Sequence, residues 1–417
     1  MNVLVTLNSL ILGGCQLNAI DLAATAEPHG VRSVIVGYRS TIPPRGPSLL
    51  DATDERGIEV QVLDASMATN SAGPALARIA EEHDIDLVHA YGGWDLRPAF
   101  QGPCRWGRRP LVQTVYEMYV SAQTYPHQPL IVGTRYLLEE QRKARPGPVD
   151  LISPPVDLTT DTPTHDSTDF TTEFGLDSSR RHVVIVSRLD ESMKELGVHH
   201  AIEAMARLER DNVDLIIVGS GDAETRLRAL GAQVNEQVDR PAVTFCGAMH
   251  DPRSAYAAAD VVVGMGSSAA RALAFAKPLI VCGEEGWYRT FTPDTAPLLF
   301  RNSFWSDRSE PDPVDHLAQQ IRALVDDADA REELADYGRE FAEQHFGLEL
   351  MAERMVDVYA RALDGHQRRS WYLDLPVEVR PGISWLKRTW EERRRPAGRE
   401  DRSSSGTAPA GADDRCG

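Results

Sequence analysis

Lysine is scarce in this chain of 417 residues. Of its 44 basic residues only Lys143, Lys194, Lys277 and Lys387 are lysines, and 62 acidic residues leave a formal net charge of −18. A chain this acidic repels polyanions, so the composition argues against a nucleic-acid partner. The acidic surplus is typical of proteins from a salty cytoplasm and equally of an ordinary acidic, high-GC composition, and the sequence leaves both explanations open.

Cysteines and long apolar runs are also few. The five cysteines are scattered without a CxxC pair, so we expect a reducing compartment and neither a disulfide framework nor a metal cluster. No run reaches the ~18 apolar residues that a membrane-spanning helix needs. The start of the chain, MNVLVTLNSLILGGCQ, lacks the basic region of a signal peptide. We therefore expect a soluble, cytoplasmic protein without a metal site.

The most informative stretch covers residues 183–221. Two apolar runs, Val183–Val186 and Leu215–Val218, flank residues whose apolar positions recur at helical spacing. This pattern predicts a βαβ unit, which implies a parallel sheet. Arg188 and Lys194 lie in the loop at the carboxyl end of the first strand, where open α/β sheets bind ligands. Two cations there suit a diphosphate, because they neutralise the charge that builds on a leaving group.

Alternating strands and helices continue on both sides of this unit, as in Rossmann-like α/β domains. A polar run after Pro154 and Pro155 is typical of a linker, and a Gly/Ser/Ala/Asp-rich end is typical of disorder. The predicted parts are a first Rossmann-like domain (1–157), a linker (158–180), a second Rossmann-like domain (181–345), C-terminal helices (346–395) and a disordered tail (396–417).

A pair of glycines, Gly13 and Gly14, precedes the first predicted helix, which runs from about Cys15 to Pro28. Glycines at this place allow close approach of the backbone and leave N–H groups free to face an anion. The same pair fits a tight turn without a ligand. The motif is not GxGxxG, so the dinucleotide-binding fingerprint is absent.

Four segments, in their order and spacing, resemble the GT-B glycosyltransferases and in particular the large retaining family 4. They are ILGGCQLNAIDLA (11–23), LISPPVDL (151–158), VVIVSRLDESMKELGVHHAIEAM with LIIVGSGD (183–205 and 215–222) and VTFCGAMHDPRSAYAAADVVVGMGSSAARALAFAKPLIV (243–281). The resemblance covers about residues 1–365. It implies two Rossmann-like domains that face each other across a cleft, with a helix at Leu348–Leu363 that crosses back to the first domain.

The resemblance also implies the reaction: transfer of a sugar from a nucleotide diphosphate sugar to an acceptor, with retention of anomeric configuration. Arg188 and Lys194 match the family's cations that hold the donor's diphosphate and are the catalytic candidates. Gly13 and Gly14 match the loop that faces the donor. Cations and helix N-termini would replace Mg²⁺, so no cofactor is expected besides the donor substrate. The acceptor is expected to be a glycan or a lipid-linked molecule of the cell envelope, and a soluble acceptor stays open.

The sequence departs from the family at two glutamates that usually lie eight residues apart around a GFG-like turn. GMG at 264–266 matches the turn, which puts Val263 and Arg271 in the places of the glutamates. The second glutamate usually accepts hydrogen bonds from the ribose, and arginine has no acceptor. Glu284 and Glu285 are the nearest replacements, or they are solvated turn residues. The donor-site candidates are Gly13, Gly14, Gly266, Ser267, Ser268, Arg271, Glu284 and Glu285.

The family's T-x-H histidine is missing as well, because Thr114 and Val115 are followed by Tyr116. His89 and His127 are the other acceptor-side candidates, and either can instead be a structural histidine. A retaining transfer needs no strong general base if the leaving phosphate takes the acceptor's proton. Two alternatives to a transferase remain: a catalytically silent scaffold of the same fold, and another GT-B reaction such as nucleotide-sugar epimerisation.

Residues 370–395 combine tryptophan with arginine. Trp385, Trp390 and Arg393–Arg395 suit an anionic membrane surface, which would place the protein at the inner face of the membrane. The same segment can instead dock the two domains together.

Overall fold

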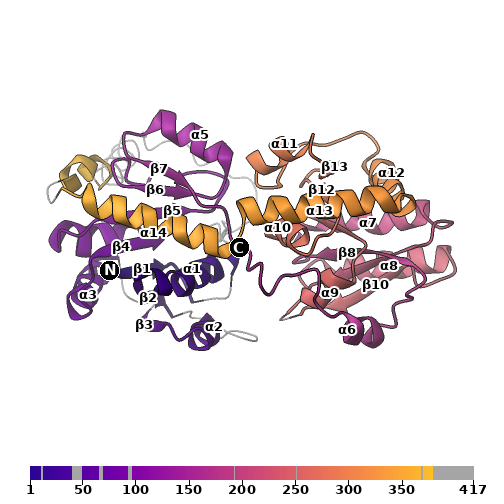
Figure 1. Ribbon diagram of the computed structural model, residues 1–417, viewed down its shortest axis with the longest axis horizontal. Coiled ribbons are helices and arrows are strands. Elements are labelled where there is room, and N and C mark those ends of the chain that lie inside the picture. Colours follow the sequence, from indigo (N-terminus) through magenta and orange to yellow (C-terminus); the bar gives the residue numbers. More distant parts are fainter. Residues whose placement is uncertain are drawn as a thin grey trace, which may run out of the picture. The chain divides into compact units, whose positions relative to one another are not determined.

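The computed structural model describes most of the chain, in the ranges 1–10, 13–39, 49–64, 69–92, 96–191, 193–249, 251–367 and 370–378. Contacts divide the chain into two compact units. Unit 1 consists of Met1–Val132, Glu140–Asp150 and Met355–Gly417. Unit 2 consists of Gly133–Glu139 and Leu151–Arg354. Each unit has its own sheet, against which helices pack (Figure 1).

Unit 1 is built on a seven-stranded sheet with the order β3-β2-β1-β4-β5-β6-β7. Its strands are β1 (Asn2–Leu7), β2 (Arg32–Tyr38), β3 (Glu59–Leu63), β4 (Leu87–Tyr91), β5 (Leu111–Val115), β6 (Leu130–Val132) and β7 (Val149–Leu151). Neighbouring strands from β3 to β6 pair in parallel, so their carboxyl ends share one edge of the sheet. Every residue of β4 and β5 is buried, as apolar runs in a covered parallel sheet predict.

Helices and short helical turns complete unit 1. They are α1 (Gly14–Thr25), η1 (Glu27–His29), α2 (Leu49–Glu55), α3 (Thr69–Glu82), α4 (Leu96–Ala99), η2 (Phe100–Trp106), α5 (Arg135–Ala144, shared with unit 2) and η3 (Ser370–Asp374). Helices α2 and α4 and the π-helical segment η2 are not predicted from the sequence. Two of these segments contain a proline, Pro98 in α4 and Pro103 in η2. A proline normally argues against a helix, so the sequence does not indicate that these segments are helical.

Unit 2 is built on a six-stranded sheet with the order β10-β9-β8-β11-β12-β13. Its strands are β8 (Arg181–Val186), β9 (Val213–Val218), β10 (Val243–Gly247), β11 (Val261–Gly264), β12 (Leu279–Cys282) and β13 (Tyr288–Thr290). Strands β8 to β12 pair in parallel, and β13 is antiparallel to β12. The three residues of β13 are too few to show an alternating pattern, and the sequence does not predict this strand.

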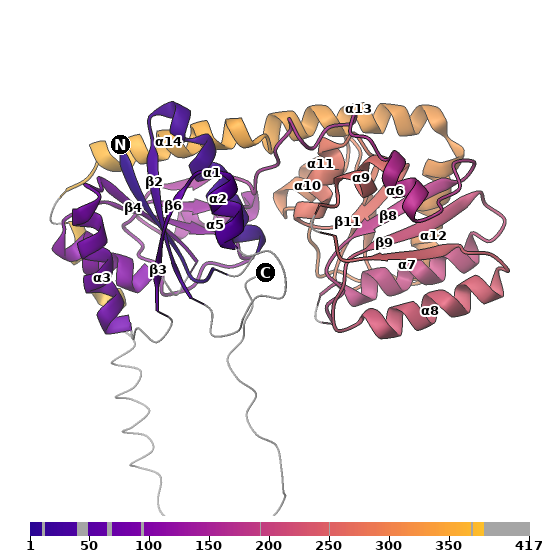
Figure 2. The ribbon, with the colours of Figure 1, turned by 90° about the horizontal axis from the view of Figure 1, so that it is seen from below.

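Side chains of the central strand β8 pack into two hydrophobic cores, one on each face of the sheet. Val183 and Ile185 pack into a cluster with α7 and α8, and Val184 packs into the opposite cluster with α10 and α13. Figure 2 shows these helix pairs on opposite sides of β8 and β9. The helices of unit 2 are α6 (Thr168–Glu173), α7 (Glu195–Arg207), α8 (Glu224–Gln237), α9 (Arg253–Ala258), α10 (Ser267–Ala274), α11 (Ala296–Arg301), α12 (Pro313–Asp326) and α13 (Ala328–His345).

The predicted linker, residues 158–180, is folded onto unit 2. It contains α6, buries Phe170 in one of the cores, and buries Asp161 to 1% exposure. Its polar residues form local turns: the Asp166 carboxylate, for example, accepts hydrogen bonds from the amide and the hydroxyl of Thr168. Such side-chain-to-backbone turns need polar residues without a helical or strand pattern. The composition that suggests a linker therefore reflects structured turns here.

The helix at the predicted crossing position is α14 (Leu348–Asp364), which begins in unit 2 and continues in unit 1. Nothing in the part of the chain that the structure describes forms a helix long and apolar enough to cross a membrane. The membrane-facing candidates Trp385, Trp390 and Arg393–Arg395 and the predicted disordered tail, 396–417, lie outside the described residues.

Candidate functional site

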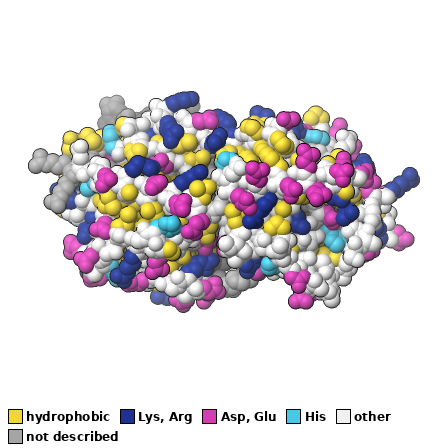
Figure 3. Space-filling model, viewed as in Figure 1, with side chains coloured by type: hydrophobic (Ala, Val, Ile, Leu, Met, Phe, Trp, Pro, Cys, Tyr) yellow, Lys and Arg dark blue, Asp and Glu magenta, His cyan; other side chains and the backbone are white. Residues whose placement is uncertain are grey.

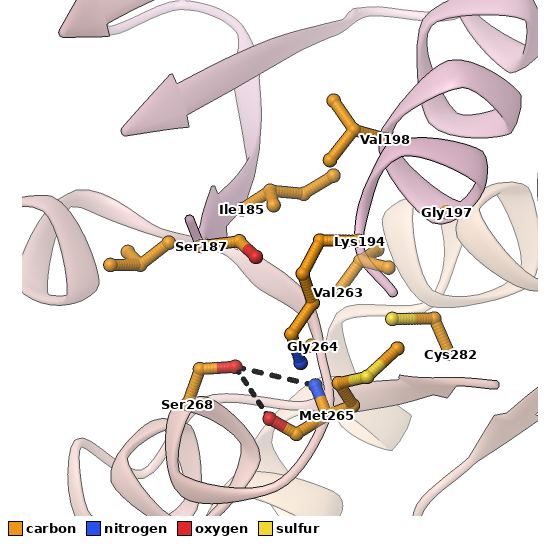
Figure 4. A pocket seen from close by; sticks show the side chains of 11 residues that line it. Ile185, Ser187, Lys194, Gly197, Val198, Val263, Gly264, Met265, Ser268 and Cys282 are labelled. Carbon is orange, nitrogen blue, oxygen red and sulfur yellow. Dashed lines mark hydrogen bonds between the residues drawn. The ribbon is translucent and has the colours of Figure 1, made fainter. Parts of the chain in front are cut away.

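A pocket lies in unit 2 at the carboxyl ends of β8, β11 and β12 (Figure 4). It encloses about 280 Å³, part of which is open solvent. Strands β8 and β11 are neighbours in the sheet, although the chain after β8 first builds outward to β9 and β10. The pocket therefore lies at the switch point of the sheet, where open α/β folds bind ligands. Polar or flexible lining residues are Ser187, Lys194, Gly264, Met265, Ser268 and Cys282.

The loop after β8 takes its shape from close backbone packing on the turn after β9. The amide of Leu189 donates to the carbonyl of Ser220 at 2.9 Å. A Cβ atom at Gly219, where φ is +143°, would lie 1.8 Å from the carbonyl oxygen of Ser187, and one at Gly221 would lie 2.3 Å from that of Leu189. Only glycines allow the two backbones to come this close.

Asp190 fixes the beginning of α7 and with it Lys194. Its Oδ1 accepts a hydrogen bond from the amide of Met193 at 3.0 Å, and its carbonyl accepts from the amide of Glu195 at 3.0 Å. The guanidinium of Arg188 lies 3.6 Å from Oδ2 of Asp190. The same aspartate thus fixes the helix start next to Lys194 and lies within ion-pair distance of Arg188. Sequence reasoning missed it, although a carboxylate two residues after Arg188 was the available signal.

The two cations differ in their surroundings. Arg188 is exposed, with 59% of its side chain accessible, whereas Lys194 is half-buried and extends toward the turn at Gly264 and Met265 (Figure 4). Burial lowers the pKa of Lys194, and the neighbouring Cys282 opposes this shift most strongly. An ammonium group in such a pocket gains from an anionic ligand, because the ligand offsets the lost hydration. Among the described residues, no group of three or more His, Cys, Asp or Glu side chains is placed to hold a metal ion.

Three donor-site candidates, Gly266, Ser267 and Ser268, form the start of α10. Gly266 has a φ of +58°, and Ser268 closes the turn by donating to the carbonyl of Met265 at 3.0 Å. The first turn of α10 carries no acidic residue, and no side chain within the described residues caps it. A helix N-terminus of this kind presents N–H groups and a partial positive charge to an anion. Of the three candidates, Ser268 lines the pocket.

The positions of the two missing glutamates have other uses here. Val263 is 1% exposed and belongs to the core of the sheet. Arg271 points to the folded segment 158–180, where its Nε donates to Oδ2 of Asp161 at 2.6 Å. Burial raises the pKa of Asp161, and the charge of Arg271 opposes that shift. Arg271, predicted to bind the donor, is thus placed in an ion pair and outside the pocket lining.

Glu284 is held in a defined position in the turn after β12. Its Oε1 accepts a hydrogen bond from the indole Nε1 of Trp305 at 2.6 Å, and its amide donates to the carbonyl of Ser306 at 2.9 Å. Its charge acts on Lys194, and Cys282, two residues before it, lines the pocket. Glu285, in contrast, is exposed. The role of Trp305 carries no signal in the sequence, because it lies 21 residues from Glu284.

His89, an acceptor-side candidate, has the contacts of a structural histidine. It is 0% exposed, with Nδ1 2.6 Å from the hydroxyl of Tyr359 and Nε2 2.6 Å from that of Thr114. Burial lowers the pKa of His89 to about 3. Both ring nitrogens are occupied and the imidazole stays neutral, so the structure favours the structural alternative over a catalytic base.

The remaining candidates lie in unit 1. Nδ1 of His127 lies 2.9 Å from Oδ1 of Asp374, so this histidine is paired as well. The hydroxyl of Tyr116 is buried and has no hydrogen-bond partner among the described residues. Gly13 precedes α1, where a Cβ atom would lie 2.5 Å from Oε1 of Gln16, and Gly14 is the first residue of α1. The two glycines therefore lie at the start of the first helix of the chain.

Residues 180–327, which contain the pocket, match the family model of glycosyl transferases group 1. Over 179 residues the chain is 28% identical to a GDP-mannose-dependent monoacylated alpha-(1-6)-phosphatidylinositol monomannoside mannosyltransferase of Corynebacterium glutamicum, covering 39% of this chain and 43% of that protein. Over 204 residues it is 26% identical to an uncharacterized glycosyltransferase of Methanocaldococcus jannaschii, covering 47% and 48%. The chain thus spans about half the length of the curated relatives it matches.

Solved structures with this fold cover nearly the whole chain. A glycosyltransferase from Rickettsia africae has a TM-score of 0.68 at 16% identity and covers 87% of this chain and 98% of its own. Anabaena HepE in complex with UDP has a TM-score of 0.67 at 19% identity and covers 86% and 100%. These likenesses confirm the predicted GT-B fold with its two Rossmann-like units, and the family match confirms the resemblance to glycosyl transferases group 1 over residues 180–327.

The ion pair of Arg271 gives a stability prediction. Arg271→Gln leaves the buried Asp161 carboxylate without its charged partner and should lower the free energy of unfolding by about 1–3 kcal/mol. This is less than the roughly 3–5 kcal/mol for breaking a fully buried pair, because Arg271 itself is 40% exposed. Adding Asp161→Asn should restore part of the loss. Urea denaturation of the single and double variants measures both effects. A single variant as stable as the wild type would show that the pair contributes nothing.

His89 gives a prediction on pH. Its folded-state pKa of about 3 is below the ordinary value of 6.5, so the unfolded chain binds the proton first as the pH falls. Stability is therefore complete above pH 6.5 and is lost below it, by about 2 kcal/mol at pH 5. The loss between pH 7 and pH 5 should shrink by that amount in His89→Gln, as measured by urea denaturation at both values. Equal losses in the two proteins would contradict a buried neutral imidazole.

Proposed function

We propose that this chain, whose residues 180–327 match the family model of glycosyl transferases group 1, transfers a sugar from a nucleotide diphosphate sugar to an acceptor with retention of anomeric configuration. One observation carries the proposal: a half-buried lysine and an exposed arginine, with Asp190 between them in the chain, lie at the switch point of the sheet in a GT-B fold. This is the arrangement that a diphosphate leaving group requires.

In the proposed reaction, Lys194 and Arg188 neutralise the charge that develops on the leaving diphosphate. The N-termini of α7 and α10 add backbone N–H groups with partial positive charge. The diphosphate accepts the proton of the acceptor's hydroxyl, so neither His89 nor His127 has to act as a base. The side chains and helix ends supply the charge that Mg²⁺ supplies elsewhere, and we propose a reaction without a metal cofactor.

The donor class follows from the relatives only in outline. Crystals of Anabaena HepE hold UDP or UDP-glucose, and the corynebacterial relative is a GDP-mannose-dependent enzyme that acts on a glycolipid. For this chain we propose a nucleotide diphosphate hexose as donor. As acceptor we propose a glycan or a lipid-linked molecule used in cell-envelope synthesis, reached from the cytoplasmic side.

A catalytically silent scaffold is the second candidate. It is favoured by Val263 and Arg271, which leave both glutamate positions without a carboxylate, and by His89, which is held as a structural residue. The two functions differ in turnover. Steady release of nucleoside diphosphate from any of a panel of nucleotide sugars supports the transferase, and binding without release supports the scaffold.

We propose that Glu284 replaces the family's second glutamate, which usually accepts hydrogen bonds from the ribose hydroxyls of the donor. Trp305 occupies its Oε1, which fixes the direction of the carboxylate, while Cys282 and Lys194 place the turn beside the pocket. A carboxylate accepts hydrogen bonds from the two hydroxyls of a ribose or a sugar. In this proposal the carboxylate oxygens that accept hydrogen bonds from these hydroxyls belong to the turn after β12 and not to α10.

The cation pair gives a binding prediction. Arg188→Gln or Lys194→Met removes a charge-assisted contact with the diphosphate and should weaken nucleoside diphosphate binding by about 10- to 100-fold, with a larger loss of turnover. Lys143→Met, which changes an exposed lysine of α5, is the matched control and should bind as the wild type does. Isothermal titration calorimetry measures the affinities. Unchanged affinity in both variants would contradict the assignment of the cations.

Glu284 gives a second binding prediction. Glu284→Gln should weaken nucleoside diphosphate binding about tenfold, since one good carboxylate acceptor is lost, and should leave the affinity for inorganic pyrophosphate unchanged. Glu285→Gln, in the same turn but exposed, is the control and should change neither affinity. If the affinity for pyrophosphate fell as well, Glu284 would act through Lys194 and not on the hydroxyls.

A further inference from the structure

Aromatic and aliphatic side chains are exposed at one place in unit 1. Trp106, at the end of η2, is 71% exposed, and Tyr372 and Leu373, in η3, are 54% and 42% exposed. Segments η2 and η3 contact each other although more than 260 residues separate them in the chain. Exposed large side chains of this kind are common singly, but a group that joins two segments marks an interaction surface.

Arginines surround these side chains. The guanidinium of Arg105 lies 5.2 Å from the ring centre of Trp106 and 5.1 Å from that of Trp371, and the guanidinium of Arg108 lies 5.0 Å from the ring of Trp371. Cation–π contacts hold the charges beside the rings, where Arg108 is exposed and Arg105 is half-buried. We call the six residues the aromatic-basic face: Arg105, Trp106, Arg108, Trp371, Tyr372 and Leu373.

Residues 370–378 carry two carboxylates, and neither belongs to the aromatic-basic face. Asp374 is 0% exposed and accepts hydrogen bonds from His127 and Gln128. Glu378 accepts from Arg97 and from the hydroxyl of Tyr125. The segment therefore buries its two acidic groups in unit 1 and leaves Tyr372 and Leu373 outside. The whole chain has a net charge of −18, and the side of the molecule drawn in Figure 3 mixes carboxylates with arginines. The aromatic-basic face differs from both, because its charged residues are arginines.

We propose that the aromatic-basic face binds the surface of a bilayer that contains anionic lipids. Tryptophan and tyrosine are the residues preferred at the membrane–water interface, and arginine pairs there with lipid phosphates. Figure 1 shows the yellow segment that follows α14 next to the end of that helix. The chain beyond residue 378 begins with a stretch of the same chemistry, in which residues 379–395 contain six basic and two acidic residues and two tryptophans. The face itself is defined without that stretch.

A membrane explains the face better than a nucleic acid does. The net charge of −18 repels a polyanion that has to approach the whole protein, whereas a bilayer is contacted by one face alone. Leu373, beside the aromatic rings, also suits the acyl region and has no role on a phosphate backbone. The proposal does not depend on the transferase reaction, because vesicle binding is measured without a donor or an acceptor.

The test is co-sedimentation of the full chain with vesicles of phosphatidylcholine alone or with 30% phosphatidylglycerol. Wild-type protein should bind the anionic vesicles and lose binding as salt is added. Arg105→Gln with Arg108→Gln should weaken binding by about 25-fold, or about fivefold for each charge. Trp106→Ala with Tyr372→Ala should weaken it about tenfold through lost apolar contact.

Exposed side chains elsewhere in the protein supply matched controls. Arg78→Gln with Arg210→Gln removes the same charge from side chains that are 69% and 93% exposed, and Tyr119→Ala removes an aromatic residue that is 69% exposed. Both controls should bind as the wild type does. Equal binding by the face variants and the wild type, or no binding of the wild type to anionic vesicles, would overturn the proposal. Self-association of the wild type that the Trp106 and Tyr372 changes abolish would assign the face to a second copy of the chain instead.

Discussion

The contact between two backbone loops, one after β8 and one after β9, determines the geometry of the proposed donor site. It exists because Gly219 and Gly221 carry no side chain where the carbonyl groups of Ser187 and Leu189 approach. With the loop held in this way, Asp190 is placed to fix the start of α7, and Lys194 enters the pocket from that start. The electrostatics of the site thus depend on a steric condition at two residues that bind no ligand themselves.

The carboxylates around the pocket are arranged around that fixed ammonium group. In place of the glutamates that the family usually has on β11 and α10, this chain has a core valine and an arginine that pairs with Asp161. Besides Asp190, the carboxylate whose charge acts on Lys194 is Glu284, and an indole N–H sets its direction. A site can keep its charge pattern when its residues move to another element, provided that the element ends at the same edge of the sheet.

Much of the fold could be predicted because buried parallel strands must be apolar on both faces. Runs such as Val183–Val186 and Leu215–Val218 therefore reveal their strands directly. The position of Arg188 and Lys194 at the carboxyl end of β8 could be predicted because they follow such a run. The side-chain pairs could not be found, because Arg271 and Asp161 lie 110 residues apart and no spacing rule connects them. The same holds for η2 and η3, whose contact arises only from folding.

The folded segment 158–180 determines where unit 2 could be separated from the rest of the chain if it were exchanged between proteins during evolution. Phe170 fills part of a core, and the guanidinium of Arg339 donates to the carbonyls of Leu158 and Asp161. A gene boundary at residue 181, where the composition suggests that the second domain begins, would remove these partners. It would leave Arg339 without the two carbonyl acceptors, Arg271 without the Asp161 carboxylate and the core with an apolar cavity. Modular exchange of unit 2 would therefore have to include the residues before its first strand, from about Leu151.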